Sequence, residues 1–287
     1  MRENFESAVI RKDGAVCDCK KVISRRVNDE GIPTLTTTIM HGITNDKTDT
    51  YKVIEIDDDS GYTSETIIAR RNSRDYRFQD CNLTRYRCAE MTVLAMRMLY
   101  HGKVQRVGFI GNGQINLLNC IAIVKAYGVN EVVIRGSGAN PAKNVGSFMT
   151  VCDNVSVDAS KDMRLLNQCD VVVICTSSCC KTEQISTSLL YGPSLIIALD
   201  GGYYLDETFR TERVSFTDWE KQTCNHYNYV FAFDKKKYTM HQMQFNHIPY
   251  NKAVVYLEGV AIADAVAAER LIERLERDGM ETPFLEE

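Results

Sequence analysis

The sequence predicts an α/β protein in which a parallel sheet, covered by helices on both faces, is joined to a smaller β-rich region. Apolar strands and helical segments alternate over residues 104–199, a pattern typical of parallel strands buried on both faces. The first strand, at 107–110, runs into a Gly-Asn-Gly turn at 111–113 and then into an apolar helical segment at 115–126. A strand, a glycine turn and a helix in this order are typical of dinucleotide-binding folds, although ordinary βα turns also match it.

The region before this turn predicts a β-meander. Strand-like segments at 21–24, 35–43 and 51–56 are separated by a Gly-Ile-Pro turn at 31–33 and a polar turn at 45–49. These segments alternate apolar and polar residues, or are rich in Thr and Ile, which favours strands that are exposed on one face.

The stretch from 57 to 82 is polar and its sequence favours no particular element, so we expect it to form a surface face. It contains Arg70, Arg71, Arg74 and Arg77. A helix should follow, with Thr84 as its N-cap and its end near Tyr100. Arg85 and Arg87 in the first turn oppose the helix dipole, so they form either a surface pair or part of an anion site.

Three polar turns follow strands of the predicted sheet. After the glycine turn, we expect strands at 131–135, 154–157, 170–175 and 195–199 and helices at 141–149 and 160–167. Thr176-Ser177-Ser178 and Asp200-Gly201-Gly202 end two of these strands. The carboxyl ends of parallel strands meet at one edge of the sheet, where ligands bind. The sequence therefore predicts a Rossmann-type domain with a dinucleotide at this edge.

The remainder of the chain predicts two further strands and one long helix. The strands are expected at 213–216 and 229–233, and the helix at 254–277. Its run of small residues, AIADAVAA, would allow close packing on a neighbouring element.

Composition excludes several classes of protein. The formal net charge is −4 and no basic block is present, so nucleic acid is not an expected partner. No apolar run approaches the roughly 20 residues that span a bilayer, and residues 1–14 lack the apolar core of a signal peptide. We therefore expect a cytoplasmic protein without a membrane partner. The 11 cysteines are scattered, which predicts reduced buried thiols and no metal site.

The end of the second strand of the sheet bears on the choice of cofactor. An acidic residue there would bind the ribose 2′-hydroxyl of NAD. The strand at 131–135 is instead followed by Gly136-Ser137-Gly138, and Arg135 and Ser137 could hold a 2′-phosphate. We expect NAD or NADP and favour NADP, with a surface role for Arg135 as the alternative.

Five patches, in the same order, resemble the ornithine cyclodeaminase/μ-crystallin family. They are LTRYRCA at 83–89, similar to the family's LTxxRTAA helix start; GNG at 111–113; DVVVICTSS at 170–178; YLEGVAIAD at 256–264; and KVIS at 21–24 with GIPT at 31–34. The resemblance implies a Rossmann domain, at 102–249, inserted into a β-rich substrate-binding and dimerisation domain, at 1–101 plus 250–287. It also implies a homodimer.

The resemblance further implies site residues. Arg87 would bind the substrate carboxylate with its planar guanidinium group. Lys21 would act near the reacting nitrogen, although it could also be a solvated strand lysine, and Lys20 could take its register. The nucleotide would contact Gly111, Asn112, Gly113, Gln114, Thr176, Ser177 and Gly259. Asp264 would lie in the same wall as Gly259.

The chain also departs from the family. Its N-terminal part is shorter, residues 57–82 contain an insertion, and Asn116 stands where the family has a small residue in the cofactor turn. The aspartate of the cyclodeaminases aligns with Gly202, which leaves Asp200 as the nearest candidate catalytic carboxylate.

The expected activity is NAD(P)-dependent oxidoreduction at the C–N bond of a small amino or imino acid. Two alternatives remain open. One is a cyclodeaminase-like lyase with tightly bound NAD, and the other is a non-catalytic binding protein like the μ-crystallins.

Overall fold

A computed structural model of the chain describes most of its residues and divides it into two compact units. The described residues are 20–29, 33–44, 48–57, 63–79, 82–136, 145–151, 154–176, 184–199, 202, 204–218, 237–240, 250–257, 259 and 261–278. Unit 1 comprises Met1–Arg87 and Gly259–Glu287, and unit 2 comprises Cys88–Glu258. The boundaries therefore lie at 87/88 and 258/259, compared with 101/102 and 249/250 in the sequence-based division.

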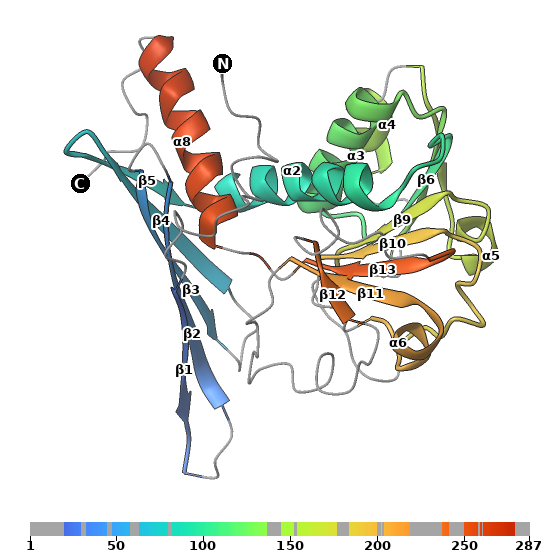
Figure 1. Cartoon of the computed structure of the whole chain (residues 1–287), viewed down its shortest axis with the longest axis horizontal. Helices are drawn as coiled ribbons and strands as arrows, with labels where there is room; N and C mark the ends of the chain where they lie inside the picture. Colours follow the sequence, from blue (N-terminus) through green and yellow to red (C-terminus); the bar gives the residue numbers. More distant parts are fainter. Residues whose placement is uncertain are drawn as a thin grey trace. The chain divides into compact units, whose positions relative to one another are not determined.

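Unit 1 contains a five-stranded antiparallel sheet whose strands pair in chain order, which confirms the predicted meander (Figure 1). The strands are β1 (Lys20–Val27), β2 (Pro33–Ile43), β3 (Asp49–Asp57), β4 (Thr63–Arg71) and β5 (Arg74–Gln79). Most of the stretch at 57–82, which the sequence left without an assigned element, forms β4 and β5, and Arg70, Arg74 and Arg77 are exposed as expected.

The β4–β5 hairpin shows why its sequence did not suggest strands. Asn72 and Ser73 both have positive φ, 49° and 63°, as a two-residue hairpin turn requires. On β4, Ile67 and Ala69 are buried while Arg70 is exposed, so Arg70 lies on the outer face of an amphipathic strand. Arg71 lies on the face towards α8, where its guanidinium group donates to the Glu269 carbonyl and to Glu273 Oε1.

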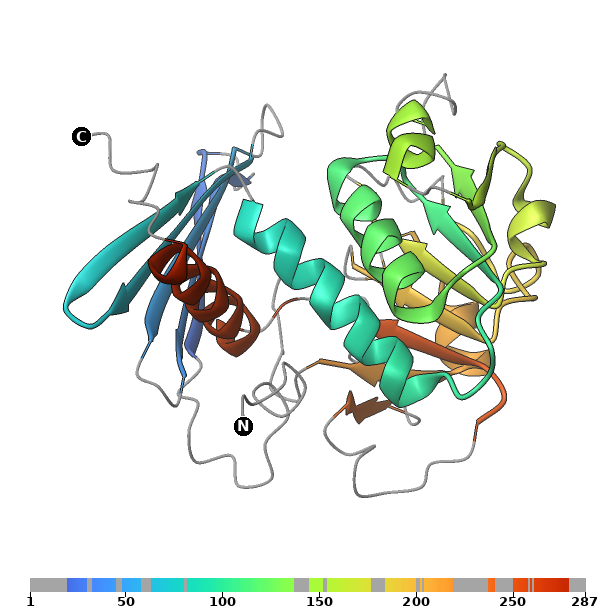
Figure 2. The same ribbon diagram turned by 90° about the horizontal axis from the view of Figure 1, so that it is seen from above.

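Helix α8 (Ala261–Arg277) covers one face of this sheet (Figure 2). Its small side chains allow close contact with the strands, and the resulting core contains Ile67, Ala69, Tyr76, Phe78, Leu83, Ala267, Ala268 and Ile272. The predicted helix at 254–277 is too long. Val254 and Val255 instead belong to strand β13 (Ala253–Tyr256) of unit 2, since β-branched residues favour a buried strand. Gly259, with φ of 88°, separates this strand from α8.

Unit 2 contains an eight-stranded parallel sheet, which confirms the predicted Rossmann-type domain. Its strand order is β12-β11-β13-β10-β9-β6-β7-β8. The strands are β6 (Arg106–Ile110), β7 (Glu131–Arg135), β8 (Ser156–Ala159), β9 (Val171–Ile174), β10 (Leu195–Ala198), β11 (Val214–Thr217), β12 (Lys237–Thr239) and β13. The predicted strand at 229–233 lies outside the described residues.

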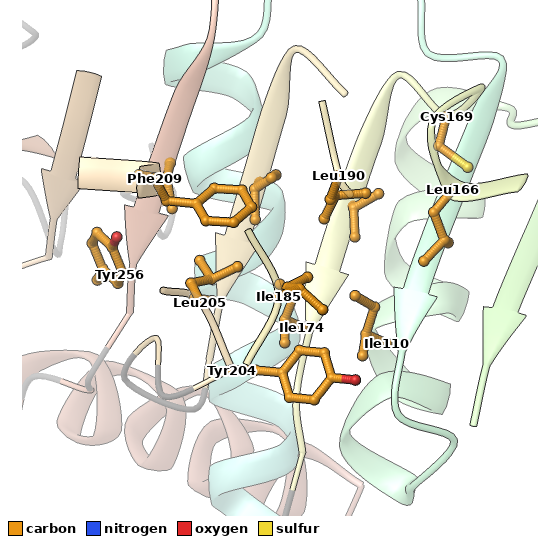
Figure 3. Packing of buried hydrophobic residues seen from close by; sticks show 14 of the residues in the cluster. Ile110, Leu166, Cys169, Ile174, Ile185, Leu190, Tyr204, Leu205, Phe209 and Tyr256 are labelled. Carbon is orange, nitrogen blue, oxygen red and sulfur yellow. The ribbon is translucent and has the colours of Figure 1, made fainter. Parts of the chain in front are cut away.

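Helices cover both faces of this sheet. They are α3 (Gln114–Tyr127), α4 (Val145–Val151), α5 (Met163–Leu166) and α6 (Thr208–Glu212); α2 (Asn82–Leu99) begins in unit 1 and continues into unit 2. Adjacent residues of β6 face opposite layers. Phe109 packs on Phe148 of α4, whereas Ile110 joins the cluster that contains Phe209 of α6 (Figure 3). No helix in the described part of the chain is long and apolar enough to cross a membrane.

Candidate substrate and nucleotide sites

The first turn of α2 places Thr84 and Arg87 in unit 1. The prediction of Thr84 as N-cap is wrong, because the helix begins at Asn82 and Thr84 lies inside its first turn. Its hydroxyl is therefore not used to cap the helix. It bonds instead with side chains from the neighbouring strands β3 and β4.

Lys52 and Glu65 are those side chains. The Lys52 ammonium donates to Thr84 Oγ1 at 2.6 Å and lies 3.2 Å from Glu65 Oε2, and the Thr84 hydroxyl donates to Glu65 Oε1. Both charged side chains are almost fully buried, with side-chain exposures of 3% for Lys52 and 6% for Glu65. A buried lysine is thus held by a carboxylate and a hydroxyl.

Asp264, in the first turn of α8, links this pair to Arg87. Its Oδ1 accepts from Arg87 Nε at 3.1 Å, and its Oδ2 lies 3.6 Å from Lys52 Nζ. Only 1% of the Asp264 side chain is exposed. We call Lys52, Glu65, Thr84, Arg87 and Asp264 the buried charge cluster.

The cluster is difficult to explain by stability alone. Two cations and two anions are buried together, and desolvation costs several kcal/mol for each ion. Buried ion pairs can often be replaced by apolar residues of similar volume without loss of stability. A buried group of opposed charges is therefore a candidate functional site.

Gly259 lies against the guanidinium group of Arg87. A Cβ on Gly259 would be 2.9 Å from both Nη1 and Nη2, and the residue has a positive φ. Any side chain here would press on the two nitrogens that suit a bidentate carboxylate contact. Gly259 therefore lies beside Arg87. The contact between Gly259 and the nucleotide stays a prediction.

Lys52 was not identified from the sequence, whereas Lys21 was. Lys21 lies in β1, where its backbone is opposite Met40 of β2, and its side chain lies outside the described residues. The available signal for Lys52 was its place on the inward face of an alternating strand, two residues after the buried Thr50. An inward lysine needs a partner, and the sequence alone did not show Glu65 or Asp264 to be that partner.

The glycine turn of unit 2 is tight and leads directly into α3. Gly111 has φ of 99°, its N–H donates to the Arg135 carbonyl at 2.8 Å, and a Cβ would lie only 2.1 Å from the Cys175 carbonyl oxygen. Gly113 is the N-cap of α3 and supplies no side-chain cap, and a Cβ there would meet nothing within 4 Å. The start of α3 thus lacks a side-chain cap that would compete with a phosphate group.

Asn116 fixes this turn from inside α3. Its Nδ2 donates to the carbonyls of Ile110 and Gly111 at 3.0 and 2.9 Å, and the residue is buried. Asn112 lies in the turn and Gln114 is the first residue of α3. The departure at Asn116 is therefore compatible with the glycine turn, since its amide bonds to the turn rather than displacing it.

Arg135 ends β7, as the sequence predicted. Its guanidinium group donates from Nη1 to the hydroxyl of Tyr204 and lies 5.7 Å from the centre of that ring. Its Nε is buried and has no hydrogen-bond partner among the described residues. Thr176 follows β9 and is half-buried. The other edge residues predicted to act, Ser137, Ser177 and Asp200, lie outside the described residues.

No group of three potential ligands for a metal ion occurs among the residues that the structure describes. No protein-family model and no curated protein sequence matches the chain.

Solved structures match the chain over nearly its whole length. The iminosuccinate reductase of Paracoccus denitrificans, in complex with NAD⁺, has a TM-score of 0.77 at 15% identity, covering 96% of this chain and 91% of that chain. The probable ornithine cyclodeaminase of Bordetella pertussis Tohama I has a TM-score of 0.75 at 16% identity, covering 97% and 93%. The Thermococcus litoralis Δ1-pyrroline-2-carboxylate reductase, in complex with NADH and L-proline, has a TM-score of 0.74 at 13% identity, covering 96% and 92%.

At these identities the likeness shows the fold. The chain has the two-unit fold of the ornithine cyclodeaminase/μ-crystallin proteins, so the resemblance inferred from the five sequence patches is confirmed at the level of the fold.

Proposed function

We propose that the protein is an NAD(P)-dependent oxidoreductase of the ornithine cyclodeaminase/μ-crystallin family, acting at the C–N bond of a small amino or imino acid. The observation that carries this proposal is the buried charge cluster. An arginine suited to a carboxylate and a buried lysine lie within one unit of a fold whose solved examples include imine reductases and cyclodeaminases.

In this proposal Arg87 holds the substrate carboxylate, and the lack of a side chain at Gly259 avoids crowding of its Nη1 and Nη2. Lys52 takes the part first assigned to Lys21. It stabilises charge and holds a proton near the reacting nitrogen, because it is the lysine placed in the same cluster as Arg87. Asp200 and Lys21 remain candidates from the family resemblance.

The nucleotide would lie at the glycine turn, with its phosphates at the uncapped start of α3 and with Thr176 and Ser177 at the neighbouring strand end. A bound nicotinamide supplies or accepts the hydride, and the protein provides orientation and electrostatics. We further propose NADP as the preferred form. Arg135, the last residue of β7, is the proposed partner of the 2′-phosphate. Its Nε has no hydrogen-bond partner among the described residues, which supports this assignment.

A homodimer is also part of the proposal. The sheet face of unit 1 opposite α8 exposes Ile39 by 43% and Tyr51 by 44%, which would favour association through that face. Light scattering coupled to size-exclusion chromatography measures the state directly.

The function is tested by ligand-induced stabilisation followed by turnover. A nucleotide at 100 times its Kd should stabilise the protein by about 2.7 kcal/mol, seen as a rise in Tm with NADPH and a smaller rise with NADH. Cyclic imino acids should then oxidise the reduced cofactor in net turnover. No stabilisation by any dinucleotide would overturn the proposal.

A cyclodeaminase-like reaction is the second candidate, because solved neighbours include lysine cyclodeaminase. It would consume ornithine or lysine and release ammonia without net change in the absorbance of the reduced cofactor.

A further inference from the structure

Asp264 has a buried carboxylate oxygen without a hydrogen bond. Its Oδ1 accepts from Arg87 Nε, whereas Oδ2 accepts from no residue that the structure describes. An ionised carboxylate can accept about four hydrogen bonds, and leaving a buried acceptor unpaired carries a desolvation penalty. Oδ2 is therefore able to accept a hydrogen bond from a ligand.

Lys52 does not donate a hydrogen bond to Asp264 Oδ2. Its ammonium lies 3.6 Å from Asp264 Oδ2, beyond hydrogen-bonding distance, while it lies 2.6 Å from Thr84 Oγ1 and 3.2 Å from Glu65 Oε2. Glu65 and Thr84 thus draw the ammonium towards β4 and α2. A water molecule or a polar group of a ligand can bridge two polar groups that lie more than 3.5 Å apart.

We propose that Asp264 Oδ2 accepts a hydrogen bond from the positively charged nitrogen of the substrate, an ammonium or an iminium. This inference rests on the proposed function and makes Asp264 the residue that distinguishes an amino or imino acid from the corresponding 2-hydroxy or 2-keto acid. Arg87, on the other oxygen of the same carboxylate, takes the substrate carboxylate.

The charges of the cluster favour the same class of ligand. Lys52 and Arg87 balance Glu65 and Asp264, so the cluster has no formal net charge. A zwitterion adds no net charge to it. The anion of a keto or hydroxy acid would add one buried negative charge without a counter-ion, which is costly in a site of low polarity.

Asp264→Asn tests the inference, because asparagine keeps the volume and an acceptor for Arg87 Nε but offers N–H donors in place of Oδ2. Isothermal titration, with saturating reduced cofactor, would compare two matched pairs: L-proline with (S)-tetrahydrofuran-2-carboxylate, and L-alanine with L-lactate. The wild type should prefer the nitrogen-containing member. The variant should lose about 10- to 150-fold of that preference, the range expected for a hydrogen bond to a charged group.

A purely structural role of Asp264 would weaken both members of a pair equally and leave their ratio unchanged, which would overturn the inference while the proposed function stands. A wild type that prefers neither member of either pair would also overturn it. If the preference exists and is lost in Asp264→Asn, but no substrate supports net or borrowed hydride transfer, the binding inference stands and the proposed function fails.

A measurement on the wild type keeps the inference testable if Asp264→Asn does not fold. Titrations repeated in buffers of different ionisation enthalpy report the protons that are taken up on binding. L-proline should bind without net proton uptake, whereas its oxygen analogue should bind with uptake of a proton or should not bind. Equal uptake for the two ligands would contradict the proposal.

Discussion

At the scale of single residues, Lys52 and Lys21 are alternative candidates for the catalytic lysine, and kcat of their variants distinguishes them. If Lys52 handles the proton at the reacting nitrogen, Lys52→Met should lower kcat by about 10²- to 10⁴-fold, the usual contribution of a general acid or base. Lys21→Met is the matched control and should change kcat by much less. Steady-state kinetics with a cyclic imino acid decides between them. A large loss in Lys21→Met with near-normal activity in Lys52→Met would return the role to Lys21.

Gly259 sets the space around Arg87. Gly259→Ala should strain a backbone with φ of 88° and push a methyl group towards a guanidinium that lies 2.9 Å from the Cβ position. We expect a rise in KM for the substrate, with a strain cost of about 1–3 kcal/mol. Gly146→Ala is the control, since a Cβ there meets nothing within 4 Å. An unchanged KM in Gly259→Ala would mean that Arg87 does not bind the carboxylate.

Cys169 should behave as a core residue rather than as a reactive thiol. Burial raises its pKa from 9.0 to about 12, so almost none of it is thiolate at pH 8 in the folded protein. Only the thiolate reacts readily with alkylating reagents. Mass spectrometry should find Cys169 unmodified by iodoacetamide at pH 8 in the native protein and rapidly modified in urea. Rapid modification of the folded protein would show that this part of the core opens.

At the scale of elements, Asn116 connects helix α3 to the end of β6. Asn116→Ala would leave the Gly111 carbonyl without the donor that holds it, at a cost of about 1–3 kcal/mol in unfolding free energy. We expect weaker binding of NADPH as well, because the turn would no longer be fixed. Asn119→Ala, which removes a buried amide bonded within the same helix, is the matched control. Equal affinity of the two variants for NADPH would show that the hydrogen bonds of Asn116 to the turn do not contribute to cofactor binding.

The elements that were predicted well are those in which local pattern and burial agree. The strand at 131–135 matches β7 to the residue, and apolar runs located β9 and β10, because strands buried on both faces are continuously apolar. The pattern left β4 and β5 unassigned and placed the residues of β13 in a helix. The first two carry charged outer faces, and the apolar run of β13 was merged with the helical segment that follows Gly259.

The candidate site was harder to predict than the sheets. Arg87 and the glycine turn could be proposed from local motifs alone, and their roles in the site stay predictions. Lys52 becomes a site candidate only through its contacts with Glu65, on the next strand, and with Asp264. Asp264 lies 177 positions after Arg87. The register between β3 and β4 and the return of the chain as α8 determine those contacts. Neither can be seen in a local sequence pattern.

For the molecule as a whole, the chain path explains why unit 1 depends on both ends of the described sequence. The chain builds the five-stranded sheet, leaves through α2 to form unit 2, and returns after β13 as α8. Glu269 of α8 accepts hydrogen bonds from Thr44 and Thr48, so the returning helix also fastens the β2–β3 connection. The carboxylate of Asp264 is therefore placed by the last element that joins the unit.

Amide hydrogen exchange should show protection by NADPH in unit 2 and protection by L-proline in unit 1. NADPH should protect amides of the glycine turn and the start of α3, in unit 2, because these groups would bond to phosphate. L-Proline, added to the cofactor-bound protein, should further protect the first turns of α2 and α8, in unit 1, where Arg87 and Asp264 lie. The oxygen analogue of proline serves as the control and should protect them less. Protection of unit 1 by NADPH alone, with the glycine turn unchanged, would place the nucleotide elsewhere and contradict the assignment of the two sites.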